Sequence, residues 1–286
     1  MQEEQIKVVL NPDAPPTGSD LGITNAARRS FGKRSEWDYQ PKTITCVSDY
    51  GDEGETYVDP KGVRVLKAKD KRLLEFLARG MTADDFGNFM QDLDDCVNIG
   101  DDEDFIKTKE LLWTWRNTPT HDTPFNHGFF SFEVKAPIFV ARHLVKHEYL
   151  IMSEYSRRYI TDDVEFYEPD VWRKAAKDVK QGSSDEGVEQ QDFWDTLVNQ
   201  NNKDQILLYT GLMKQGVAPE QARMVLPQSL MTSWTWSGTL GAFANMCKLR
   251  LGKDTQAETR YVAEKVYEEL KKQFPVAAPL LVEGVY

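Results

Sequence analysis

The chain has 286 residues, of which 40% are hydrophobic and 28% charged, and a net charge of −11, a composition typical of a soluble globular protein with a sizeable buried core. The acidic balance argues against a nucleic-acid polymer as a partner, because its phosphates would be repelled, although a local basic pocket can still hold a small anionic nucleotide. No apolar run is long enough to span a bilayer, and the acidic N-terminus lacks the apolar segment of a signal peptide, so we expect no membrane partner.

The first third of the chain mixes short strands, helices and an acidic loop. A short strand near the N-terminus is followed by a predicted helix over residues 19–33, which Ser19 or Asp20 can cap. Short strands are expected at 43–47 and 64–66. Helices are predicted over the ranges 71–99 and 107–115, and the acidic run between them indicates a solvated loop, because it lacks the spacing of a calcium-binding loop.

A strand and a helix are predicted around the four histidines of the chain. Residues 128–135 alternate between apolar and polar side chains, which predicts a strand with one face in the core. A helix is predicted next, with Val145 and Tyr149 on its apolar face. His143 and His147 stand at i,i+4 spacing on the same helix. The ten residues that follow show no decisive pattern.

The last part of the chain is mainly helical in its pattern. Residues 165–215 favour helices, with an exposed connection at 181–187. A strand is expected at 231–236, and two further helices at 241–251 and 256–274. This order lacks the strand–helix alternation of a doubly wound sheet, so it predicts a mixed α+β fold that is rich in helices.

A cationic cluster lies between His121 and Tyr159, in a chain that is acidic as a whole. This stretch holds all four histidines. Around Glu148 and Glu154 it also holds four cationic side chains, those of Arg142, Lys146, Arg157 and Arg158. Clustered guanidinium groups bind phosphate through charge-assisted, bidentate hydrogen bonds. The stretch therefore indicates a site for a phosphorylated small molecule.

A metal site at these histidines is disfavoured. The spacing of His143 and His147 is the one that zinc hydrolases use on a helix. However, no Glu follows the first His, so the general base of that motif is absent. Lys146 also lies between the two histidines, and a cation beside two ligands would oppose metal binding. We therefore expect no metal.

A cysteine or serine nucleophile is also disfavoured. The three cysteines Cys46, Cys96 and Cys247 all lie outside the cationic cluster, and Ser156 has no nucleophile-elbow glycines around it. The odd number and wide spacing of the cysteines indicate reduced thiols. This is expected in the cytoplasm, or in the host cytoplasm if a phage encodes the chain.

Several separated motifs resemble, in the same order, those of the flavin-dependent thymidylate synthases. The Arg-His-Arg signature of that family, followed by seven residues and Ser, is similar to Lys146-His147-Glu148 with Ser156. The similarity continues to Arg158 and Tyr159. Further matching segments are 26–32, 121–127, 132–142, 222–227, 232–245, 249–251 and 256–258.

The resemblance implies a fold, an assembly and a reaction. The fold is a single α+β domain over residues 1–286, helix-rich with a central, mostly antiparallel sheet and an insertion at about 34–105. The assembly is a homotetramer in which several subunits build each active site. The reaction is the reductive methylation of dUMP to dTMP, with methylenetetrahydrofolate as carbon donor and NADPH-reduced FAD as hydride source.

The resemblance also assigns roles by position. Arg250 is implied as the catalytic residue, a cation placed where negative charge develops on the pyrimidine. The implied dUMP contacts are His143, Glu154, Ser156, Arg157, Arg158, Arg223 and Arg250. The implied FAD-lining residues are Ser30, Thr123, Lys146, His147, Glu148, Glu154, Thr239 and Asn245. His121 and Tyr159 are implied on the folate or nicotinamide side.

The chain departs from the family pattern at five of these motif positions. Lys146 keeps the charge of the first signature Arg but loses its fork, whereas Glu148 reverses the charge of the second, so no flavin-phosphate contact is implied there. His143 replaces Gln, and Ser153 and Thr239 each replace Asn. These changes leave open a relative that acts on dCMP or leaves a hydroxymethyl group. They also leave open a catalytically silent nucleotide-binding or assembly protein on the same scaffold.

Overall fold

The computed structural model describes residues 5–47, 53–79, 121–158, 164–176 and 183–283, with the single positions 87 and 91. The chain divides into two compact units. Unit 1 contains residues 1–17 and 129–273, and unit 2 contains residues 18–128 and 274–286. The interpretation as a single domain with an insertion stays a prediction. The acidic loop and the helices predicted after residue 79 lie outside the described residues, apart from positions 87 and 91.

A four-stranded antiparallel sheet forms the centre of unit 1. Its strands stand in the order β1 (Lys7–Leu10), β4 (Phe129–Pro137), β8 (Met231–Thr239) and β5 (Leu150–Glu154). The strands predicted at 128–135 and 231–236 are confirmed, each slightly longer than the pattern indicated. Together with the helices below, this sheet confirms the predicted helix-rich α+β fold class.

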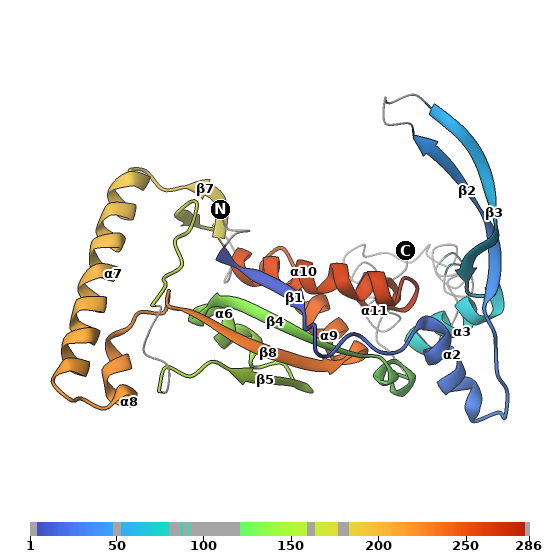
Figure 1. Ribbon diagram of the computed structural model, residues 1–286, viewed down its shortest axis with the longest axis horizontal. Helices are drawn as coiled ribbons and strands as arrows, with labels where there is room; N and C mark the ends of the chain where they lie inside the picture. The colour runs from blue at the N-terminus through green and yellow to red at the C-terminus, as the bar shows by residue number, and fades with distance from the viewer. Residues whose placement is uncertain are drawn as a thin grey trace, which may run out of the picture. The chain divides into compact units, whose positions relative to one another are not determined.

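Helices cover one face of this sheet (Figure 1). They are α6 (Ile138–Leu144), α9 (Leu240–Arg250) and α10 (Ala257–Gln273). Phe132 of β4 and Trp236 of β8 are fully buried, and both rings meet Phe243 of α9 edge-on, with centroids 5.1 and 5.2 Å away. Each such aromatic side chain contributes about 1.5–3 kcal/mol by leaving water. The alternating pattern of β4 therefore produces the expected core.

One glycine lets β5 lie close to β8. Gly238 stands opposite Leu150 in the register of the two strands. A Cβ atom at Gly238 would lie 2.5 Å from Leu150 Cδ2 and 3.1 Å from the carbonyl oxygen of Tyr149. A larger residue at Gly238 would crowd the side chain of Leu150 and the backbone of Tyr149 at the start of β5.

Helix α6 is shorter than the sequence predicted. It ends at Leu144, so Val145 and Tyr149 do not lie on a buried helix face; they are 56% and 84% exposed. Tyr149 has φ 62°, the left-handed conformation that reverses the chain into β5. The expectation that His143 and His147 share one helix was therefore wrong.

The region after β5 is only partly helical. The strand β6 (Arg173–Ala175) lies where a helix was predicted, so that prediction was wrong there; it pairs with β7 (Ser183–Gly187). The helical remainder is α7 (Gln191–Lys214), which contacts α8 (Pro219–Ala222) and the 3-10 turn η2 (Arg223–Val225). The connection at 181–187 thus contains a strand.

Unit 2 combines helices with a long hairpin. Helix α2 (Asp20–Arg29) is capped by the Ser19 side chain, which accepts a hydrogen bond from Gly22 N. The hairpin is longer than the two short strands predicted there. The other elements of the unit are β2 (Asp38–Val47), β3 (Glu53–Val65), α3 (Ala68–Arg79), η1 (Thr123–His127) and α11 (Ala277–Val282). Within the described residues, no helix is both long enough and apolar enough to cross a bilayer.

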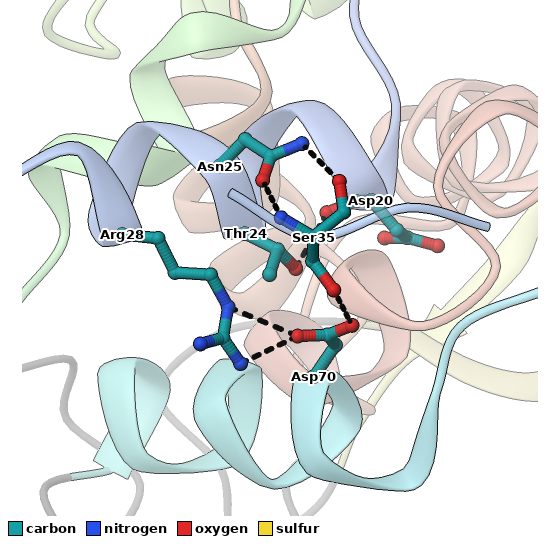
Figure 2. A network of polar contacts seen from close by, with 6 residues as sticks. All are labelled: Asp20, Thr24, Asn25, Arg28, Ser35 and Asp70. Carbon is teal, nitrogen blue, oxygen red and sulfur yellow. Dashed lines mark hydrogen bonds and ion pairs between the residues drawn. The ribbon is translucent and has the colours of Figure 1, made fainter. Parts of the chain in front are cut away.

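A buried carboxylate ties α2 to α3 (Figure 2). Asp70 is fully buried, and its Oδ1 accepts hydrogen bonds from Nε and Nη2 of Arg28 at 3.0 and 2.6 Å. The hydroxyl of Ser35 donates to the other carboxylate oxygen at 2.5 Å. Asn25 in turn exchanges two hydrogen bonds with the backbone of Ser35. Both oxygens of the buried charge are therefore satisfied, as burial of a carboxylate requires.

Candidate functional site

The segment that leaves β5 forms a cavity of about 330 Å³. Glu154 ends the strand, and Ser156, Arg157 and Arg158 follow it closely. Arg223, at the start of η2, lines the same cavity from a distant part of the sequence. The fold thus brings together five of the seven residues predicted as dUMP contacts.

Short contacts hold this segment in place. The Thr232 hydroxyl of β8 donates a hydrogen bond to Glu154 Oε1 at 2.9 Å. Tyr155 N donates to the carbonyl of Ser233 at 2.8 Å, which extends the pairing of β5 with β8 by one residue. The Arg157 guanidinium lies 5.2 Å from the centroid of the Tyr155 ring, and the residue as a whole is 8% exposed. Arg157 is therefore packed against an aromatic ring, whereas Arg158 and Arg223 are exposed.

A hydroxyl and two exposed guanidinium groups therefore line a small hollow. The Ser156 hydroxyl accepts long hydrogen bonds of 3.4 Å from the backbone N and Nε of Arg158. Guanidinium forks with a nearby hydroxyl match the geometry of a phosphate group. Glu154 lines the same cavity with one oxygen bonded to Thr232. The arrangement can bind a phosphate group, while the carboxylate of Glu154 accepts a hydrogen bond from a polar group of the same ligand.

Arg250 is held by the residue at the centre of the signature motif. Its Nε donates to His147 Nε2 at 2.9 Å, and its Nη2 donates to the carbonyl of His143 at 3.3 Å. Partial burial, with the positive charge of Arg250, lowers the pKa of His147 to about 4. His147 is therefore a neutral acceptor at neutral pH. No sequence pattern indicated this pairing, because the two residues are 103 positions apart.

A second, larger cavity contains Arg250. It measures about 860 Å³, and its lining includes His143, Lys146 and Arg250. His143 Nδ1 lies 3.1 Å from the hydroxyl of Thr259, and burial, together with the charges of Arg250 and Lys146, lowers its pKa. A neutral His143 at this wall can donate or accept a hydrogen bond. The cavity has room for a ligand larger than a phosphate.

An ion pair that sequence reasoning missed lines the same cavity. Glu258 of α10 is 3% exposed; its Oε1 accepts from Arg173 Nη2 at 2.5 Å and from the Tyr167 hydroxyl at 3.4 Å. Burial, followed by the charge of Glu258, raises the pKa of Tyr167. Glu258 lies in the 256–258 segment that the resemblance covered, but its partners Tyr167 and Arg173 lie in a region that none of the matching motifs covers.

The other predicted residues are placed as follows. In unit 1, the Thr239 side chain caps α9 by accepting from Ala242 N, while Asn245 and Glu148 are exposed. In unit 2, the Ser30 hydroxyl donates to the carbonyl of Ala27, Thr123 begins η1, and His121 stacks on Phe76 with ring centroids 6.0 Å apart. Tyr159 lies outside the described residues.

Two features of the described part of the chain bear on the expectations for a metal and for a thiol. No group of three His, Cys, Asp or Glu side chains there could hold a metal ion. Cys247 is fully buried on α9, and burial raises the pKa of its thiol, which disfavours a thiolate.

These features define an α+β protein with two cation-lined cavities, a class suited to small anionic ligands. The model of the Thy1 family, described as thymidylate synthase complementing protein, matches residues 65–276. The match covers well over half of the chain, so the chain belongs to this family.

Two curated relatives carry the name flavin-dependent thymidylate synthase. The chain is 35% identical to the protein from Thermus thermophilus over 181 residues, which cover 63% of this chain and 66% of that one, just under two thirds. It is 32% identical to the protein from Treponema denticola over 191 residues, covering 63% of this chain and 70% of that one.

A solved structure shares the fold. It is the UMP/dUMP methylase PolB from Streptomyces cacaoi, bound with 5-Br dUMP, with a TM-score of 0.63 and 22% identity. The superposition covers 96% of this chain and 93% of that one. At this identity the likeness bears on the fold alone.

Proposed function

We propose that the chain is a flavin-dependent thymidylate synthase, a methyltransferase that converts dUMP into dTMP. Its membership of the family supports the reaction. The observation that carries the proposal is the convergence of Ser156, Arg158 and Arg223 on one small cavity beside Glu154. This set suits a nucleoside monophosphate, because two guanidinium groups and a hydroxyl complement one phosphate dianion.

In this proposal the phosphate of dUMP binds Ser156, Arg158 and Arg223, and Arg157 supports the segment through its contact with Tyr155. Glu154 keeps one oxygen for a polar group of the nucleotide, since Thr232 bonds only the other. His143 extends the dUMP contacts towards the larger cavity. Binding at several points fixes the orientation of the pyrimidine before reaction.

Arg250 is proposed to stabilise the negative charge that develops on the pyrimidine ring. Of its five N–H donors, two are used by His147 and the carbonyl of His143, which leaves three for a ligand. Neutral His147 and the carbonyl of His143 orient the guanidinium, and no carboxylate among the described residues forms an ion pair with it. Preorganised donors of this kind give large transition-state stabilisation.

The net reaction replaces the C5 proton of dUMP with a methyl group. Methylenetetrahydrofolate gives the methylene carbon and leaves as tetrahydrofolate, and NADPH gives two electrons and becomes NADP⁺. FAD, when bound, supplies the hydride that completes the methyl group. The chain contributes by binding, orienting and polarising the pyrimidine.

The flavin-lining residues support a FAD site only in part. Lys146 and Asn245 are exposed and have no hydrogen-bond partner among the described residues, so their N–H groups are available to a flavin. Glu148 is an exposed carboxylate, which would repel a flavin phosphate and is not proposed to contact one. His147, Glu154, Thr239, Ser30 and Thr123 complete the proposed set, and His121 and Tyr159 are proposed on the folate or nicotinamide side.

We further propose a homotetramer, as the resemblance implies, located in the cytoplasm. Helix α7 supports an assembly, because it exposes large apolar side chains: Phe193 is 51% exposed, Trp194 45% and Leu207 72%. Exposed apolar surface of this kind marks interaction sites. Light scattering on the purified protein tests the assembly; a monomer at micromolar concentration would contradict it.

A second candidate is a related methylase or hydroxymethylase that acts on dCMP. The replacement of Gln by His143 favours it, because this side chain lies in the cavity that contains Arg250 and its ring nitrogens can donate or accept. Incubation with dUMP and dCMP in parallel, each with methylenetetrahydrofolate, FAD and NADPH, separates the two. The proposal expects methylated dUMP; a methylated or hydroxymethylated cytosine nucleotide alone would contradict it.

The colour of the purified protein distinguishes an active enzyme from a catalytically silent scaffold. An enzyme of this class is yellow and releases a flavin when denatured. A folded protein that is colourless, takes up no FAD and binds no pyrimidine monophosphate would instead be a scaffold.

A further inference from the structure

Unit 2 carries a cationic hollow that none of the roles above uses. It measures about 730 Å³ and its wall includes Arg29 at the end of α2, Lys33 and Arg34 in the following loop, and His127 at the end of η1. All four side chains are exposed. Among the described residues, no carboxylate forms an ion pair with any of them.

The neighbouring arginine behaves in the opposite way. Arg28 forms an ion pair with the buried Asp70 (Figure 2). Arg29, one residue later, lines the hollow. The chain as a whole has a net charge of −11, so carboxylates are abundant. Three cations around one hollow, with no carboxylate partner among the described residues, create a local positive potential, which attracts an anion.

The loop that carries Lys33 and Arg34 is fixed at both ends. At its start, Gly32 has φ +62°, and the backbone N of Lys33 donates to the carbonyl of Arg28 at 3.2 Å. At its end, Ser35 is bound by Asn25 and Asp70 (Figure 2). The cations are therefore carried on a preorganised backbone, which reduces the entropy lost on binding.

We propose that this hollow binds the 2′-phosphate of NADPH and so makes the enzyme prefer NADPH to NADH. This inference rests on the proposed function, which requires a nicotinamide dinucleotide as electron donor. A phosphomonoester carries about 1.5–2 negative charges at neutral pH, so it gains more from several cations than a carboxylate does. Arginine is the residue that accommodates a 2′-phosphate in other dinucleotide-binding proteins.

The position of the hollow within unit 2 agrees with this role. His127 ends the same 3-10 turn that follows His121, the residue proposed for the nicotinamide side. Helix α2, which carries Arg29, packs against this turn. A volume of about 730 Å³ also lies in the range of small-molecule pockets, and exceeds what a bare phosphate needs.

A binding experiment without catalysis tests the inference. Adenosine 2′,5′-bisphosphate, AMP and inorganic phosphate are titrated separately into the full-length protein by calorimetry, with dUMP present at saturation. The bisphosphate is expected to bind at least about tenfold more tightly than AMP, because one charge-assisted hydrogen bond can lower the dissociation constant by a factor of about ten or more. Equal affinity for AMP or for inorganic phosphate would overturn the assignment to a 2′-phosphate. So would a folded protein that binds none of the three.

Charge-neutral variants identify the residues. Arg29→Gln and Lys33→Gln should each weaken binding of the bisphosphate by about tenfold while leaving the affinity for AMP unchanged. Lys71→Gln is the matched control, because Lys71 is an exposed cation on α3 outside the hollow. Unchanged bisphosphate affinity in both hollow variants, or an equal loss in Lys71→Gln, would overturn the inference.

A kinetic experiment then separates this inference from the proposed function. The ratio of kcat/KM for NADPH to that for NADH should fall about tenfold in each hollow variant and stay unchanged in Lys71→Gln. A protein that methylates dUMP with no such change keeps the proposed function and loses this inference. A protein that binds the bisphosphate as expected but makes no dTMP loses the proposed function and the NADPH preference, and keeps only the phosphate site in the hollow.

Discussion

The contact between Arg250 and His147 offers the sharpest test of the proposed site. Arg250→Ala removes the cation from the larger cavity and leaves His147 and the carbonyl of His143 without their donor. Loss of one preorganised donor to a developing negative charge costs about 2.7–4 kcal/mol, or roughly 10²–10³ in kcat. We therefore expect near-complete loss of turnover with flavin still bound. The affinity for the dUMP phosphate should change little, because its proposed ligands line the other cavity.

Two further substitutions are expected to lower the rate of turnover by smaller amounts. Arg250→Lys keeps the charge but lacks the fork that makes both contacts, so an intermediate rate is expected. His147→Leu keeps Arg250 but removes the 2.9 Å contact that orients it. A hydrogen bond to a charged donor contributes about 1.5–3 kcal/mol, so kcat should fall about 10- to 150-fold.

The assay is single-turnover formation of dTMP from bound dUMP, normalised to the flavin content of each variant. Circular dichroism serves as the control for folding. The reasoning is refuted if Arg250→Ala loses flavin while its turnover per bound flavin stays at the wild-type value. Equal rates in wild type and His147→Leu would refute the positioning role of His147.

Three other predictions concern pH, stability and the thiol. Because the pKa of His147 is lowered from 6.5 to about 4, the unfolded state binds more protons than the folded state between these pH values. The free energy of unfolding, measured by urea titration, should therefore fall as the pH drops through this window. The fall should be smaller in His147→Leu. Asp70→Ala leaves the largely buried Arg28 without its partner and should lower the free energy of unfolding by about 3–5 kcal/mol, measured by thermal unfolding. Glu186→Gln, at an exposed ion pair, should lower it by less than about 1 kcal/mol. Equal losses in the two variants would contradict the role of burial. Cys247→Ala should keep kcat within about twofold, since the thiol is buried with a raised pKa, and loss of turnover in the folded variant would point to thiol chemistry.

Local patterns were sufficient to predict the elements that form the core of unit 1. The alternation in residues 128–135 and the helical spacing in 256–274 depend only on neighbours in the chain, and both elements lie close to where they were expected. The pattern failed at α6, because a helical spacing continues past Leu144 although Tyr149 turns the chain into β5. The end of this helix is decided by the pairing of β5 with β8, which no local spacing reveals.

Residue identity and motif order were enough to select Ser156, Arg158, Arg223 and Arg250 as positions of interest. Their neighbours could be learned only from the folded chain. Folding places Arg223 beside the end of β5, and it joins Arg250 to a neutral His147 and Glu258 to Arg173. The physical reason is that strand register and helix packing bring distant residues together, and the pKa values and hydrogen bonds of a site arise only from those neighbours.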